Sequence, residues 1–275
     1  MVTELRTTNP VLTRLAADAA RERAAAAGHQ QMYGAPPQAY PTSPDVIGAT
    51  PPTVRTMTVD DVVVRTVGLL ALVTVAAGAV WMLAPPETAG ALAFPAAMVG
   101  LVLGLVISFA RVTNPFVIGA YALVEGVFIG GFSQFLANVT GRPEIVLQAV
   151  IATLGVFLLM TILYKNRVIR ATPKFRRGML AALAGCAGVI LINLVLSLFG
   201  VDTGIRGGGG LAIVASLVFI VVAALSFILS FHEVEEGVRL GLPEKYAWAC
   251  AFGILVSLIW LYLEVLRLLS YFSGE

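Results

Sequence analysis

Seven long apolar runs limit the folds that this sequence can form. A helix needs about 20 residues to cross the roughly 30 Å hydrocarbon core of a bilayer. In lipid, backbone polar groups need partners within their own segment or in a closed barrel, and barrel strands are shorter and alternate in polarity. The sequence therefore predicts seven spanning helices, with Pro95 as a site for a kink. The runs are Val62–Leu83, Ala91–Ala110, Phe116–Leu136, Ile145–Tyr164, Met179–Gly200, Leu211–Phe231 and Ala247–Phe272.

Composition and motifs exclude several classes of protein. Apolar residues make up 58% of the chain and charged residues 12%, against about 25% charged residues in soluble domains. A net charge of +2 is too balanced for nucleic-acid binding. No HExxH motif, phosphate-binding loop or paired nucleophile and base occurs, so we expect neither an enzyme nor a resident cofactor. The preference for arginine over lysine, with much Ala, Val, Leu and Gly, is typical of a GC-rich bacterial genome.

The first 55 residues differ from the remainder of the chain. Val11, Leu12 and Leu15 precede an Ala-rich stretch with arginines, which could form a short amphipathic helix. Gln, Pro, Gly and Ser dominate from His29 onward, and such composition favours extended chain. We predict a disordered cytoplasmic tail over residues 1–55 and a seven-helix transmembrane domain over 56–275. The tail could be a plain spacer, or it could contact a partner or lipid.

The links between the apolar runs predict the orientation in the membrane. The link from Lys165 to Arg177 holds six basic residues and no acid, whereas the links after the first, third and fifth runs hold at most one base. Cytoplasmic links carry the excess of Lys and Arg. We therefore expect this link and the N-terminus in the cytoplasm of a bacterial cell, and the C-terminus outside its plasma membrane.

Two acids lie within the apolar runs. A charge at the bilayer centre costs about 2.5–3.5 kcal/mol, so such a residue usually faces other helices or a cavity. Glu125 lies about 14 Å along the third run and Glu264 about 25 Å along the seventh, at 1.5 Å per residue. Both are candidates for an ion pathway. Arg267 shares a helix face with Glu264, so a local ion pair is the alternative.

A second polar cluster follows the sixth run. His232, Glu233 and Glu236 lie close together near the predicted cytoplasmic face. They could hold a cation or respond to pH, because carboxylates attract divalent cations and histidine titrates near neutrality. Their spacing differs from that of an EF-hand loop. A solvated acidic helix end is the alternative, and whether a metal binds is left open.

Three stretches together resemble one family. They are YALVEGVFIGGFS at 121–133, ATPKFRRGMLAA at 171–182 and IWLYLEVLRLLSYF at 259–272. In this order, within seven apolar runs, they resemble the Bax inhibitor family, the transmembrane BAX-inhibitor-motif superfamily, in its bacterial YccA-like branch. The resemblance covers about residues 57–272.

The resemblance implies a fold and an activity. The fold is a seven-helix bundle in which six helices surround the last. The activity is a pH-sensitive calcium leak, closed by a hydrogen-bonded pair of aspartates on the sixth and seventh helices. Ser230 and Glu264 occupy the matching positions here. Because serine does not ionise, the pair is incomplete, and Glu125 is a candidate substitute acid.

These observations predict an integral membrane protein that passes or senses Ca²⁺ or H⁺, with at most transient Ca²⁺ binding. Protonation of buried carboxylates would gate it. The alternative is a non-conducting modulator of a membrane-bound protease or another membrane protein, which the family branch also includes. The N-terminal tail would then be the contact, because a flexible segment can reach a partner.

Overall fold

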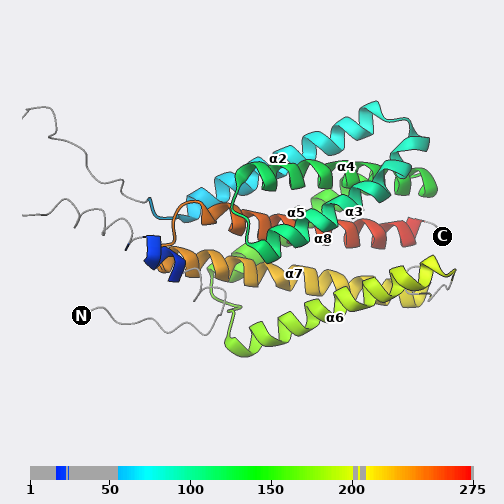
Figure 1. Cartoon of the computed structure of the whole chain (residues 1–275). Helices are drawn as coiled ribbons and strands as arrows, with labels where there is room; N and C mark the ends of the chain where they lie inside the picture. The colour runs from blue at the N-terminus through cyan, green and yellow to red at the C-terminus, as the bar shows by residue number, and fades with distance from the viewer. Residues whose placement is uncertain (1–16, 23, 25–54, 201–203, 205–208, 274–275) are drawn as a thin grey trace, which may run out of the picture.

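The protein is an all-α bundle of seven long helices. The computed structural model describes residues 17–22, 24, 55–200, 204 and 209–273. Within these residues, seven helices are long and apolar enough to cross a membrane, which confirms the predicted fold class (Figure 1). They are α2 (Val59–Leu83), α3 (Pro86–Ala110), α4 (Pro115–Thr140), α5 (Glu144–Lys165), α6 (Pro173–Leu198), α7 (Gly210–Arg239) and α8 (Tyr246–Ser273).

The helices extend beyond the apolar runs. α6 begins at Pro173 rather than Met179, and α7 ends at Arg239 rather than Phe231. Apolar composition marks the part of a helix that crosses lipid, whereas backbone hydrogen bonding continues into the aqueous layer. Proline is also well tolerated in the first turn of a helix, as at Pro173 here. α3 continues through Pro95 as one helix.

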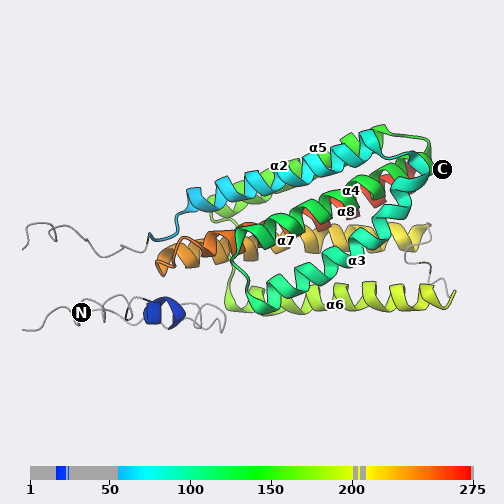
Figure 2. The same ribbon diagram turned by 45° about the horizontal axis from the view of Figure 1, so that its top comes forward.

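The last helix lies at the centre of the bundle. α8 packs against α2, α4, α5 and α7, and buried side chains follow it from Tyr246 to Ser270. α3 makes its main contacts with α4, and α6 makes its main contacts with α7. α6 runs along one edge of the bundle in both ribbon views (Figures 1 and 2). Four helices therefore pack directly around α8, while α3 and α6 are attached on the outside.

Two glycines of α4 bring α2 close to it. A Cβ atom on Gly126 would lie 2.6 Å from the Cβ of Ala76 and 2.7 Å from the carbonyl oxygen of Val73. A Cβ on Gly130 would lie 2.6 Å from the carbonyl oxygen of Ala77. Small residues at helix contacts let backbones approach in membranes, where packing replaces the hydrophobic effect. The absence of a side chain at these two positions sets the α2–α4 spacing.

The segment before α2 is joined to the link between α7 and α8. The Met57 amide donates to the Leu242 carbonyl at 2.7 Å, and the Glu244 amide donates to the Arg55 carbonyl at 2.9 Å. Met57 is buried at the end of the core. Thr58 then caps α2, because its hydroxyl accepts from the Asp61 amide while the Asp61 carboxylate accepts from the Thr58 amide, a reciprocal capping arrangement.

Part of the predicted N-terminal tail is visible. Residues 17–22 and 24 are helical, and the rest of the stretch before residue 55 lies outside the described residues. The Glu22 carboxylate lies 2.5 Å from the Lys245 ammonium group in the α7–α8 link, and Ala19 is buried. This hydrogen bond raises the pKa of Lys245. The Lys245 ammonium group therefore stays charged to a higher pH than that of a free lysine.

The outer surface of the bundle is apolar. Met82, Phe109 and Phe116 each expose at least 84% of their surface, and many Val and Leu side chains of the spanning helices are also exposed. Monomeric soluble proteins rarely expose continuous apolar patches of this kind, whereas lipid tails solvate them. With seven sufficiently long helices, the chain is a multi-pass membrane protein whose surroundings are a lipid bilayer.

Candidate functional site

Glu264 lies in the interior of the bundle on the central helix. Only 2% of its surface is exposed, and its Oε1 atom accepts a hydrogen bond from Nη1 of Arg267 at 2.9 Å. The Arg267 side chain is largely buried as well. Residues three apart share a helix face, so the local ion pair anticipated from the sequence is present. Cys186 of α6 lies within electrostatic range of Glu264, although α6 makes its main contacts with α7.

Glu125 is buried on α4 at the contact with α3. A Cβ atom on Gly100 of α3 would lie 2.6 Å from Oε1 of Glu125, so the carboxyl fits only because residue 100 has no side chain. Tyr121, one turn earlier on α4, interacts with the carboxyl, and its ring packs against Gly104 of α3. Gly100 and Gly104 of α3 thus leave room for the Glu125 and Tyr121 side chains of α4.

The structure does not bring Glu125 and Glu264 into one pair. Glu125 lies about 15 Å from the start of α4 and Glu264 about 27 Å from the start of α8, at 1.5 Å per residue. Both helices start at the same end of the bundle (Figure 1). Glu125 faces Gly100 of α3, whereas Glu264 faces Arg267 of its own helix. The two carboxyls have different neighbours and different depths.

Ser230 also lies away from Glu264. Its hydroxyl oxygen is 4.0 Å from the position that a Cβ on Gly253 would take. Gly253 and Glu264 are separated by about 16 Å along α8. One turn earlier on α7, the Ser226 hydroxyl donates to the Ser257 hydroxyl of α8 at 3.0 Å. At this level α7 and α8 therefore meet through hydroxyl groups.

A further buried hydrogen bond joins α4 to α8, and the sequence reasoning missed it. The hydroxyl groups of Ser133 and Tyr262 lie 2.7 Å apart. Both residues occur within the stretches that resemble the family, but a hydroxyl in an apolar run can hydrogen-bond equally well to the backbone of its own helix. The only signal available was the presence of polar atoms in segments predicted to be buried.

The cluster after the sixth apolar run lies on the last turns of α7. Glu236 is buried and accepts from Arg239 at 2.5 Å, and Glu235 accepts from the Tyr164 hydroxyl of α5. His232 is half-buried and Glu233 is exposed. Within the described part of the chain, no three His, Cys, Asp or Glu side chains are grouped so that they could hold a metal ion. The proposed cation site at His232, Glu233 and Glu236 therefore has no preformed cage.

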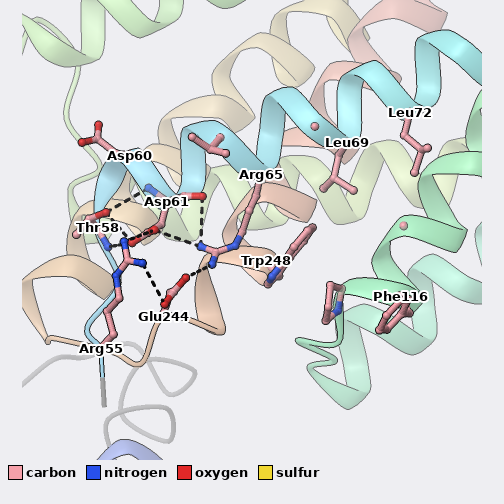
Figure 3. A pocket seen from close by; sticks show the side chains of 14 residues that line it. Arg55, Thr58, Asp60, Asp61, Arg65, Leu69, Leu72, Phe116, Glu244 and Trp248 are labelled. Atoms are coloured by element: carbon pink, nitrogen blue, oxygen red, sulfur yellow. Dashed lines mark hydrogen bonds and ion pairs between the residues drawn. The ribbon is translucent and has the colours of Figure 1, made fainter. Parts of the chain in front are cut away.

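A cleft of about 990 Å³ opens at the end of the bundle where α2 begins. Figure 3 shows Arg55, Asp61, Arg65 and Glu244 converging on one another at one side of it. Arg65 donates to Glu244 at 2.6 Å, and Arg55 lies 3.1 Å from Asp61 and 3.6 Å from Glu244. Glu244 is 179 residues from Arg65, and no local pattern connects them.

Comparison with known proteins agrees with the motifs. The family model described as Bax inhibitor 1 like matches residues 9–274, which is nearly the whole chain and includes most of the N-terminal tail. A comparison with curated proteins found no match. Together, the seven spanning helices, the central last helix and the match over nearly all residues establish that the chain belongs to the Bax inhibitor 1 like family of multi-pass membrane proteins.

Proposed function

We propose that this protein is a pH-sensitive leak for Ca²⁺ or H⁺ in a bacterial plasma membrane, of the YccA-like branch, with Glu264 as its gating acid. The observation that supports this most is the position of Glu264, which is 2% exposed in the central helix, against which four others pack. Acids buried within spanning helices usually serve ion or proton pathways. No catalytic step is part of the proposal.

The Glu264–Arg267 ion pair supplies the two states that a gate needs. Ionised Glu264 holds the Arg267 guanidinium at 2.9 Å. Protonation removes the counter-charge, and a buried cation without one is strongly disfavoured. The long Arg267 side chain would then extend towards the nearby membrane surface, as basic side chains do near helix ends. α6 is attached to the bundle mainly through α7, so it is the element most easily displaced.

Glu125 serves in this proposal as a second, separate acid. Ser230 cannot ionise, and it faces Gly253 rather than Glu264. Two independent carboxyls therefore take the place of a titrating pair on α7 and α8. Glu264 is paired with Arg267 on α8, and Glu125 lies against α3. Ionisation of Glu125 would place a negative charge against Gly100. This would weaken the contact that attaches α3 to the bundle.

The proposed orientation places the end of the bundle with the cleft in the cytoplasm. The basic link between α5 and α6, the start of α2 and the α7–α8 link all lie at this end (Figure 1). The positive-inside rule assigns such a basic link to the cytoplasmic side. Ions leaving the cell interior would then pass the cleft first and the Glu264–Arg267 pair later.

Calcium-dye flux into proteoliposomes over a pH series tests the gate. We expect flux through the wild-type protein to change with pH, and Glu264→Gln to remove most of this dependence. Glu125→Gln should shift the profile without abolishing it. Glu144→Gln is the matched control, because Glu144 is an exposed acid at the start of α5, and its profile should equal the wild type. Flux no higher than in protein-free liposomes at every pH would reject the leak. An unchanged profile for Glu264→Gln would reject the gating residue.

A second candidate is a non-conducting modulator of a membrane-bound protease or another membrane protein. It is favoured by the Glu22–Lys245 ion pair, through which the N-terminal segment contacts the α7–α8 link, and by a family match that begins at residue 9. Capture of partners from membranes, with the full chain and with residues 1–55 deleted, tests it. Loss of a membrane partner on deletion would favour this function, and equal capture by both forms would count against it.

A further inference from the structure

We propose that the cleft beside the start of α2 binds a zwitterionic phospholipid with a primary ammonium group, of the phosphatidylethanolamine type. The headgroup would lie against the charged side chains, and the upper part of one acyl chain would follow α2 and α4. This site is separate from Glu264 and does not depend on the proposed ion leak.

The cleft has the size and position of a headgroup site. Its volume of about 990 Å³ is enclosed by α2, the first turns of α4 and the α7–α8 link with the start of α8. These segments lie where the apolar spans begin, so the cleft is level with the headgroups of the membrane. Trp248 and Phe116 lie on the same side of the charged group (Figure 3). Aromatic side chains are enriched at this level of the membrane.

The basic side chains leave one guanidinium available for a phosphate. Arg65 is largely buried and held by Glu244 at 2.6 Å, and it also lies over the Trp248 ring at 5.4 Å. Arg55 has a side chain that is 67% exposed, and its contacts to Asp61 and Glu244 are longer. Arginine binds phosphate oxygens in a forked geometry. Arg55 can therefore contact a lipid phosphate while the Arg65–Glu244 bond stays intact.

The acids of the cleft favour a headgroup that also carries a positive charge. Asp60, Asp61 and Glu244 line the cleft together with two arginines, so negative charge is in excess. The Asp60 side chain is exposed and points away from the ion-paired group (Figure 3). A lipid with a net negative charge would be repelled by this excess, since like charges placed together are unfavourable. An ammonium group beside the phosphate would be attracted to it.

The apolar wall of the cleft distinguishes a lipid from a soluble phosphoamine. Leu69 and Leu72 of α2 lie opposite Gly119 of α4, and a Cβ on Gly119 would meet Leu72 at an ordinary 3.9 Å. Gly68 adds no side chain to this wall. The cleft therefore has an apolar part along α2, from Val64 to Leu72, beside its charged part. An acyl chain would lie along this apolar part, whereas a soluble ligand would leave it uncovered.

Native mass spectrometry of the full-length protein in detergent tests this proposal. Phosphatidylethanolamine, phosphatidylglycerol and soluble glycerophosphoethanolamine are added separately and in competition. We expect about tenfold more bound phosphatidylethanolamine than phosphatidylglycerol, as one charge-assisted contact predicts. Glycerophosphoethanolamine should not displace the lipid.

Three variants distinguish the cleft from general lipid binding. Arg55→Gln should lower the bound phosphatidylethanolamine about tenfold, as loss of one charge-assisted contact predicts. Gly119→Leu should remove the bound lipid by filling the apolar wall while leaving the ion pairs intact, and it favours helix formation by about 1 kcal/mol. Arg111→Gln is the matched control, because Arg111 lies at the same end of the bundle and does not line the cleft.

The opposite results would overturn the proposal. Equal binding of the two lipids, or an unchanged lipid adduct in Gly119→Leu, would show that the cleft is not the site. Displacement by glycerophosphoethanolamine would show a soluble ligand instead of a lipid. If Gly119→Leu does not fold, an unchanged adduct in Arg55→Gln still rejects the proposal, because that exposed side chain is not needed for packing.

Discussion

At the scale of single residues, buried polar atoms decide which helix faces meet. Ser133 with Tyr262 and Ser226 with Ser257 each join α8 to a neighbour, while Glu264 is joined to Arg267 of its own helix. Only the last of these could be predicted from the sequence, because residues three apart on a helix are always neighbours. Partners on different helices depend on how the helices rotate and dock.

The Glu264–Arg267 pair should show strong non-additivity in stability. Arg267→Met leaves a buried carboxylate without its cation, and breaking a buried pair in this way costs about 3–5 kcal/mol. Adding Glu264→Gln removes the uncompensated charge, so the double variant should recover most of that loss. Thermal unfolding in detergent at neutral pH compares Arg267→Met, Glu264→Gln and the double variant with the wild type. Equal losses in the single and double variants would show that the pair is not coupled.

At the scale of elements, the lipid environment makes the helices predictable from apolar composition. It does not determine where each helix ends or which helices pack together. All seven apolar runs are helical, but α6 and α7 continue past them into polar sequence. Which helix approaches the glycines of α4 was not predictable, and the structure shows that Gly126 and Gly130 face α2 while Glu125, directly before Gly126, faces α3.

Gly130→Ala should loosen the α2–α4 contact. Its Cβ would lie 2.6 Å from the Ala77 carbonyl oxygen, and overpacking against a backbone typically costs about 1–3 kcal/mol. This exceeds the gain of up to about 1 kcal/mol from the better helix propensity of alanine. Gly155→Ala on α5 is the control, because no atom lies within 4 Å of its Cβ position, and it should be neutral or stabilising. Thermal unfolding of both variants tests this, and a Gly130→Ala protein as stable as Gly155→Ala would contradict the close approach.

At the scale of the whole molecule, the antiparallel helices gather the charged features at one end. The basic link between α5 and α6, the ion-paired cleft and the contact between Glu22 and Lys245 are all at the end where α2 begins (Figures 1 and 2). The opposite end carries the α4–α5 link and the end of α8. This asymmetry is what a fixed orientation in a membrane requires.

Cysteine labelling on the two ends of α5 tests the orientation. Arg142 and Asn166 are both exposed and flank this helix, so Arg142→Cys and Asn166→Cys form a matched pair. Replacing Cys186 and Cys250 first removes the native thiols. On right-side-out vesicles, a membrane-impermeant maleimide should label Arg142→Cys directly and Asn166→Cys only after the membrane is opened. The reverse pattern would place the basic link outside the cell.

The sequence by itself determined the helical class, the number of spans and the family, because these depend on local apolarity and on motifs within single segments. It also located the two buried acids, since a carboxyl in an apolar run is evident without a structure. Only the tertiary structure decided that Glu125 faces α3, that Ser230 and Glu264 are apart, and that Arg65 meets Glu244 across 179 residues. Helix rotation and docking set these contacts, and they result from packing over the whole bundle rather than from any one segment.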